Sequence, residues 1–144
     1  MKRCLLIPVL LALAACAEKS GPQVSISDVR ILAPAIASHA SVAYFNIDNN
    51  TAETLTIIGV RSPQFGLVEI HETTTDDGVS RMRRIESIDI AGRSTLSFSP
   101  GGKHLMLMQP AANVISGTPV TLEVQVGDQL LLVSSELQDR IPPQ

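Results

Sequence analysis

Short alternating segments separated by turn residues are the feature of this sequence that most constrains its fold. Residues 120–126 alternate four valine or leucine residues with polar ones, and a two-residue hairpin turn, Gly127-Asp128, follows. We expect the other strands at residues 24–31, 41–48, 54–60, 67–73, 80–85, 95–99, 103–108 and 130–134, with residues 88–92 as a short connection. No convincing amphipathic helix interrupts them. This spacing predicts an all-β sandwich or barrel.

The first residues have the pattern of a targeting segment. Lys2 and Arg3 precede an apolar stretch at 5–14 that is too short to span a bilayer, and Leu13-Ala14-Ala15-Cys16 follows. This arrangement resembles a bacterial lipobox, which implies cleavage after residue 15 and lipid on Cys16. The alternative is an ordinary secretory signal with an incidental cysteine. Ala17 after the cysteine, rather than aspartate, favours the outer membrane by resemblance to lipoprotein sorting in Gram-negative bacteria.

The expected division of the chain follows from that segment. Residues 1–15 are read as the signal peptide, 16–23 as the lipidated cysteine and its tether, 24–137 as one domain and 138–144 as a frayed tail. Acyl chains on Cys16 would hold the domain at a membrane, in the periplasm.

Composition argues against two broad classes of function. The net charge is −3 at pH 7, aromatic residues make up 3% of the chain, and no cluster of basic residues follows the targeting segment except for Arg81, Arg83 and Arg84. Nucleic-acid binding is therefore not expected. No Ser/His/Asp set or carboxylate pair with recognisable spacing appears, so we do not expect an enzyme. The three arginines are read as a solvated strand face, with docking to an acidic partner as the alternative.

The stretch 101–108 places an imidazole and two thioethers at alternate positions. Successive side chains of a strand point to opposite faces, so His104, Met106 and Met108 share one face and the intervening leucines share the other. Methionine fills gaps in cores more often than it binds metals, so this stretch alone is more typical of a buried strand than of a metal site.

A predicted hairpin supplies a second imidazole and thioether. Thr75-Asp76-Asp77-Gly78 is a strong turn signal between His71 and Met82. With a two-residue loop, His71 lies opposite Arg84, and Met82 is its diagonal neighbour on the same face. With a four-residue loop the two are directly opposed, whereas a three-residue loop places them on opposite faces.

Two imidazoles and two thioethers favour Cu(I) among biological metals, since both ligand types are neutral and the thioether is soft. Zinc prefers cysteine, histidine or carboxylate. A blue-copper centre needs a cysteine thiolate, and Cys16 is the only cysteine left after cleavage of the signal peptide.

The four residues also carry a family resemblance. The chain resembles the PCu(A)C periplasmic copper chaperones, whose pattern is His, ten residues, Met, twenty-one residues and His-x-Met; His71, Met82, His104 and Met106 match each interval. The flanks Val68-Glu69-Ile70 and Pro100-Gly101-Gly102 are similar too. The resemblance implies a cupredoxin-like Greek-key β-sandwich that binds Cu(I) through these four residues. It also implies delivery to a copper-accepting protein, typically cytochrome c oxidase, or exchange with another copper chaperone.

Two departures from the family qualify this expectation. The chain has no tryptophan, and residues 134–144 contain no His or Met, so a single copper site is predicted. Met108 is read as packing and His39 as a solvated surface residue. The resulting hypothesis is a monomeric, lipid-anchored Cu(I) carrier; the alternative is a structural or adhesion sandwich lipoprotein without metal.

Overall fold

The computed structural model describes residues 22–34 and 39–140, and within these ranges it contains ten strands and no helix. The strands are β1 (Val24–Leu32), β2 (Ser41–Asn49), β3 (Leu55–Arg61), β4 (Phe65–Asp76), β5 (Val79–Ile85), β6 (Ile88–Ile90), β7 (Ser94–Phe98), β8 (Lys103–Pro110), β9 (Pro119–Val126) and β10 (Gln129–Gln138). The prediction of an all-β fold is confirmed. No helix in the described ranges could cross a membrane. The predicted signal peptide, Cys16 and most of its tether lie outside the described residues, as do the last four residues.

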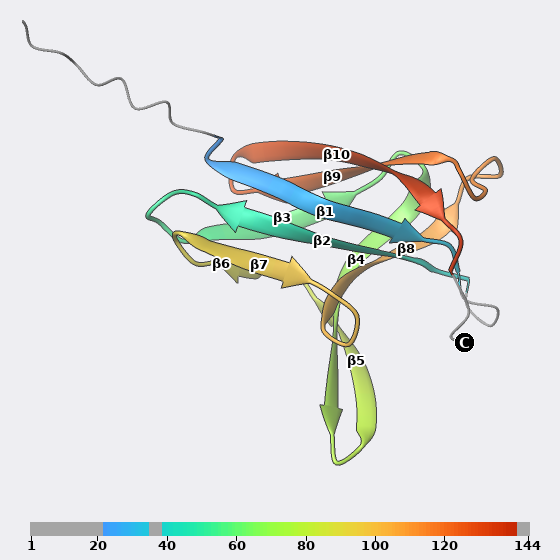
Figure 1. Ribbon diagram of the computed structural model, residues 1–144, viewed down its shortest axis with the longest axis horizontal. Helices are drawn as coiled ribbons and strands as arrows, with labels where there is room; N and C mark the ends of the chain where they lie inside the picture. Colours follow the sequence, from blue (N-terminus) through green and yellow to red (C-terminus); the bar gives the residue numbers. More distant parts are fainter. Residues whose placement is uncertain (1–21, 35–38, 141–144) are drawn as a thin grey trace, which may run out of the picture.

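The strands form two antiparallel layers (Figure 1). One has the order β5-β4-β8-β2-β1, with β7 beside the second half of β2, and the other has the order β10-β9-β3-β6. A short parallel pairing of β1 with β10, at Ile31 with Leu137, connects them. Neighbours that are distant in sequence, such as β4 with β8, give the Greek-key connectivity. The chain is therefore a Greek-key β-sandwich, as predicted.

The core lies between the layers and is built by the inward half of each alternating strand. Phe45 of β2 and Phe98 of β7 stack within this core, with ring centroids 4.4 Å apart. Fully buried aliphatic side chains from both layers belong to the same core: Ile31, Ile47, Ile57, Ile90, Leu105, Leu107, Val120, Leu122 and Val124. On β8 the two leucines face this core, so the residues between them face outward.

One segment has a different type of structure from the one predicted. Residues 88–90, expected in a connection, form the edge strand β6, which pairs with β3 from Leu55–Ile90 to Ile57–Ile88. The buried Asn49 explains why this short strand is held in place. Its amide nitrogen donates hydrogen bonds to the carbonyls of Glu53, Ile90 and Ala91, at 2.7, 3.0 and 3.1 Å. This anchor requires residues distant in sequence to meet, so the local pattern of 88–92 did not reveal it.

The β4–β5 hairpin is longer than predicted and projects from the body of the sandwich (Figure 1). Asp76 pairs with Val79, which leaves Asp77 and Gly78 as a two-residue loop. Both loop residues have positive φ angles, 48° and 76°, as a type I′ turn requires. The far end of this hairpin has no second layer against it, so most of β5 is exposed.

Candidate metal site

A tight turn immediately before β8 sets the position of His104. Pro100 and Gly101 occupy the centre of the turn, Gly101 has a φ of 79°, and the Gly102 N–H donates a hydrogen bond to the Ser99 carbonyl at 3.1 Å. Proline followed by a residue with positive φ is typical of a type II turn, which favours glycine at the second position. The Gly102 carbonyl then accepts two hydrogen bonds at 3.0 Å, from the Thr73 N–H and from Nδ1 of His104. The turn thereby fixes both the register of β8 on β4 and the orientation of the His104 ring.

That register brings the predicted residues onto one face. His71 of β4 lies opposite His104 of β8, and their ring centroids are 6.1 Å apart. On the other side of β4, Thr73 pairs with Met82 and His71 with Arg84, as the two-residue loop predicts. Met82 is thus a diagonal neighbour of His71. Met106 lies two residues after His104 on β8 and therefore on the same strand face. All four side chains belong to the outward face of this layer.

Three of the four residues line a common cavity of about 210 Å³: Met82, His104 and Met106. Its remaining wall is formed by Ala40, Val42, Tyr44, Thr73, Gly101 and Arg140. His104 is 5% exposed, whereas Met82 is 54% exposed and lies at the rim. The cavity therefore has a buried imidazole on one side and an exposed thioether on the other.

His71 lies beside this cavity rather than among its lining residues. Its Nε2 is 2.9 Å from Oε2 of Glu69, which is on the same strand face two residues earlier. Its Nδ1 is buried and has no hydrogen-bond partner among the described residues. With metal–nitrogen bonds of about 2 Å and ring nitrogens about 1 Å from the ring centre, two rings 6.1 Å apart are within reach of one ion.

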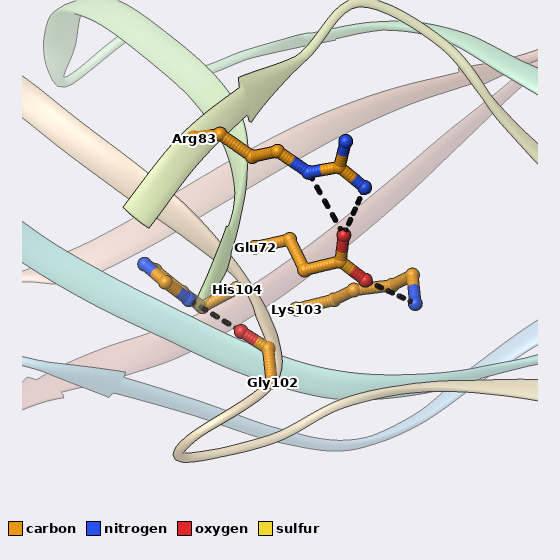
Figure 2. A network of polar contacts seen from close by, with 5 residues as sticks. All are labelled: Glu72, Arg83, Gly102, Lys103 and His104. Atoms are coloured by element: carbon orange, nitrogen blue, oxygen red, sulfur yellow. Dashed lines mark hydrogen bonds and ion pairs between the residues drawn. The ribbon is translucent and has the colours of Figure 1, made fainter. Parts of the chain in front are cut away.

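Charged residues flank the site on both faces of the β4–β5 hairpin. On the site face, Arg84 Nη1 is 3.2 Å from Glu69 Oε1. On the opposite face, Glu72 accepts from Arg83 at 2.7 Å and from Lys103 at 3.0 Å (Figure 2). Hydrogen bonds from Arg83 and then Lys103 lower the pKa of Glu72 below its usual value of 4.5. These pairs tie β5 and β8 to β4 close to the site.

The donor set is soft and uncharged. Within the described ranges, there is no group of three or more His, Cys, Asp or Glu residues that could hold a metal ion. Two imidazoles with two thioethers can instead hold a soft cation without adding negative charge. The buried, unpartnered Nδ1 of His71 fits this use, because a polar atom in such a position normally has a partner.

Two other residues that were considered from the sequence lie outside the cavity. Met108 pairs with Leu67, and His39 is exposed; neither lines the cavity. Conversely, the sequence reading did not single out Tyr44 and Arg140 as part of the cavity wall. No local pattern marks these two residues, because strand pairing and the course of the chain after β10 bring them to the cavity. Glu69 could have been found, since it shares the alternating face of His71.

Comparison with protein families and curated proteins identifies one family and one relative that are described as lipoproteins, and a second relative that is not. The family model described as "Putative lipoprotein LpqE-like" matches residues 24–133. A protein of Leifsonia xyli subsp. xyli named "Putative lipoprotein Lxx21020" is 29% identical over 133 residues, covering 83% of this chain and 78% of that one. "Uncharacterized protein RP573" of Rickettsia prowazekii is 31% identical over 78 residues, and the match spans 54% of this chain but only 43% of that protein.

Solved structures with the same fold include PCuAC domains and the protein DR1885. The "Copper-bound PCuAC domain from PmoF2" aligns with a TM-score of 0.64 at 19% identity, covering 85% of this chain and 97% of that domain. The Cu(I) form of DR1885 from Deinococcus radiodurans aligns with a TM-score of 0.66 at 21% identity, covering 85% and 83%. These likenesses confirm the predicted cupredoxin-like fold and the structural resemblance to PCuAC domains.

Proposed function

The chain belongs to the LpqE-like lipoprotein family, whose model matches residues 24–133, and we propose that it is an extracytoplasmic copper chaperone. In this proposal it binds one Cu(I) ion as cargo and passes it to a partner by ligand exchange, without catalytic turnover. His71, Met82, His104 and Met106 are the proposed ligands. The observation that carries the proposal is that one imidazole and two thioethers line a single cavity on the outward face of β4, β5 and β8, with the second imidazole beside it, 6.1 Å from the first between ring centroids.

The chemistry of this donor set supports Cu(I) over harder ions. Thioether sulfur together with imidazole nitrogen suits Cu(I), whereas zinc sites use histidine with thiolate or carboxylate and not thioether, and calcium and magnesium sites are built from oxygen ligands. The names of two structural neighbours, one a copper-bound domain and the other a Cu(I) form, are in line with this choice.

The uneven exposure of the ligands supports transfer rather than permanent storage. His104 is buried and oriented by the Gly102 carbonyl, so it can hold the ion in place. Met82 is 54% exposed, so a ligand from a partner can approach the bound ion from that side and replace the thioether of Met82. The partner is a copper-accepting or copper-donating protein, such as a cytochrome c oxidase subunit or another copper chaperone.

The proposed location follows from the family and from the first residues. Relatives named as lipoproteins support lipid attachment outside the cytoplasm. We propose Cys16 as the lipidated residue and the periplasmic face of the outer membrane as the location, with the domain acting as a monomer.

Titration with Cu(I) under anaerobic conditions tests the copper proposal. A form that starts at residue 17 should bind one equivalent, with sulfur scattering from thioether in the X-ray absorption spectrum. Replacing Met82 and Met106 together with alanine should weaken affinity by at least about 10–100-fold, the size of effect that even outer-shell changes have on metal sites. Met108→Ala is the matched control, because Met108 lies on the same strand face but does not line the cavity.

The result that overturns the proposal is equal stoichiometry and affinity for wild type and the double variant. Failure of wild type to bind Cu(I) at all would leave the metal-free structural or adhesion lipoprotein. Sustained copper-dependent turnover of a substrate would instead place the chain among the metalloenzymes.

A further inference from the structure

The two histidines of the site are held by acceptors at different ring nitrogens. Oε2 of Glu69 lies 2.9 Å from Nε2 of His71, and the carbonyl oxygen of Gly102 lies 3.0 Å from Nδ1 of His104. An ionised carboxylate and a backbone carbonyl can only accept hydrogen bonds. In its neutral form, therefore, His71 carries its proton on Nε2, whereas His104 carries its proton on Nδ1.

The opposite nitrogen of each ring is left with a free lone pair. On His71 this is Nδ1, which is buried and has no partner among the described residues. On His104 it is Nε2, on a ring that lines the cavity with Met82 and Met106. A neutral imidazole binds a metal through its unprotonated nitrogen, and the hydrogen bond made by the other nitrogen decides which one that is.

We infer that Glu69 is a positioning residue that makes Nδ1 of His71 a copper-binding atom, while His104 binds through Nε2. This inference rests on the proposed function and adds to it a mixed mode of histidine coordination. It also assigns a role to Glu69, which does not itself touch the ion.

The surroundings of Glu69 are suited to this role. Arg84 binds Oε1 at 3.2 Å, which leaves Oε2 for the histidine ring. The side chains of Glu69 and His71 are only 16% and 18% exposed, so water competes weakly for their hydrogen bond. The lone pair of a buried Nδ1 without a partner is unfavourable, and binding of a soft cation removes that penalty.

Nitrogen-15 NMR of the histidine rings tests the inference directly, because protonated, unprotonated and metal-bound ring nitrogens have distinct chemical shifts and Cu(I) is diamagnetic. In the copper-free protein, His71 should be the Nε2–H tautomer by at least about tenfold, given the strength of a hydrogen bond to a charged acceptor. On addition of one equivalent of Cu(I), the shift change should fall on Nδ1 of His71 and on Nε2 of His104.

Two carboxylate variants separate positioning from general charge. Glu69→Ala should lose the tautomer preference of His71, and part of the copper-bound population should switch to Nε2 of His71. Glu69→Gln, which keeps an acceptor oxygen, should restore Nδ1 binding. Glu72→Ala is the matched control: it removes a paired carboxylate next to His71 in sequence but on the other strand face, and should leave the ring shifts unchanged.

Each outcome bears on one proposal. A copper-induced shift on Nε2 of His71 in wild type would overturn the inference while the copper proposal stands. Unchanged Nδ1 binding in Glu69→Ala would remove Glu69 from the explanation. If neither ring responds to Cu(I), the proposed function itself fails. The wild-type spectra decide the first point even if Glu69→Ala does not fold.

Discussion

The pairing of Glu72 with two cations gives a residue-scale test based on pH. Because Arg83 and Lys103 lower its pKa in the folded protein, Glu72 contributes stability at pH values above 4.5, its usual value. This contribution is lost as pH falls through the lowered pKa, because the protonated carboxyl no longer pairs with either cation. At neutral pH, Glu72→Gln should reduce the free energy of unfolding by about 1 kcal/mol or less, since Arg83 is largely exposed.

Urea unfolding of Glu72→Gln and wild type between pH 7 and pH 3 measures this effect. The difference between them should shrink below pH 4.5 and disappear once Glu72 is protonated. Glu86→Gln is the control, since Glu86 is exposed and forms no ion pair in the part of the chain that the structure describes. Identical pH profiles for the two variants would contradict the assignment.

Single residues differ in how far the sequence defines their roles. The alternation of His104, Leu105 and Met106 is sufficient to place the leucine in the core and the other two on the opposite face. The hydrogen bond from His104 to Gly102 could not be predicted in the same way. It depends on where the type II turn places the Gly102 carbonyl relative to the His104 ring. A Pro-Gly sequence favours such a turn but does not define that placement.

At the scale of elements, the β4–β5 hairpin determines which thioether reaches the cavity. Thr73 lies directly opposite Met82 and lines the same cavity, whereas Thr74 points to the other face and is exposed. Whether a methionine on this hairpin can bind copper should therefore depend on the strand face from which its side chain projects, and less on which of the two strands carries it.

A methionine-relocation experiment tests this. The variant Met82→Ala should lose Cu(I) affinity, and adding Thr73→Met should restore a substantial part of it, because a thioether returns to the same face. Adding Thr74→Met instead should restore nothing. Affinity is measured by competition with a Cu(I) chelator, and equal recovery by both methionines would contradict the role of the strand face.

The sequence predicted the β4–β5 hairpin but did not define the length of its loop. The Asp77-Gly78 pair indicates a two-residue turn, and the observed pairing of Asp76 with Val79 confirms that version. Three loop lengths were nevertheless compatible with the sequence, and one of them separates His71 from Met82. The structure decides between them through pairing of β4 with both β5 and β8, which fixes the strand on two sides.

At the scale of the whole molecule, the site and the start of the domain lie at different ends of β2. Val24 pairs with Asn49, and Gln23 is hydrogen-bonded to Gln129 at the β9–β10 turn. Met106 pairs instead with Val42, about seven residues or about 24 Å along β2. A lipid anchor at Cys16 would therefore hold the domain by the end that is remote from the cavity.

This arrangement predicts that membrane attachment leaves the site accessible. The exposed Met82 should be oxidised by hydrogen peroxide at the same rate in the lipid-anchored protein on vesicles and in the form that starts at residue 17, as measured by mass spectrometry of the peptide that contains it. Protection of Met82 on vesicles would show that the cavity faces the lipid surface. Absence of lipid on the mature protein would contradict the anchor itself.

The sequence by itself determined the fold class and the inward and outward faces of the strands, and it supplied the four residues that we propose as copper ligands. These follow from local rules, since strand alternation and turn chemistry depend on near neighbours. Only the tertiary structure decided the pairing of β4 with β8, the edge strand β6, the cavity wall at Tyr44 and Arg140, and the acceptor that fixes each histidine. The physical reason is that strand pairing joins residues far apart in the chain, and it is this pairing that brings two separate His–Met pairs to one face.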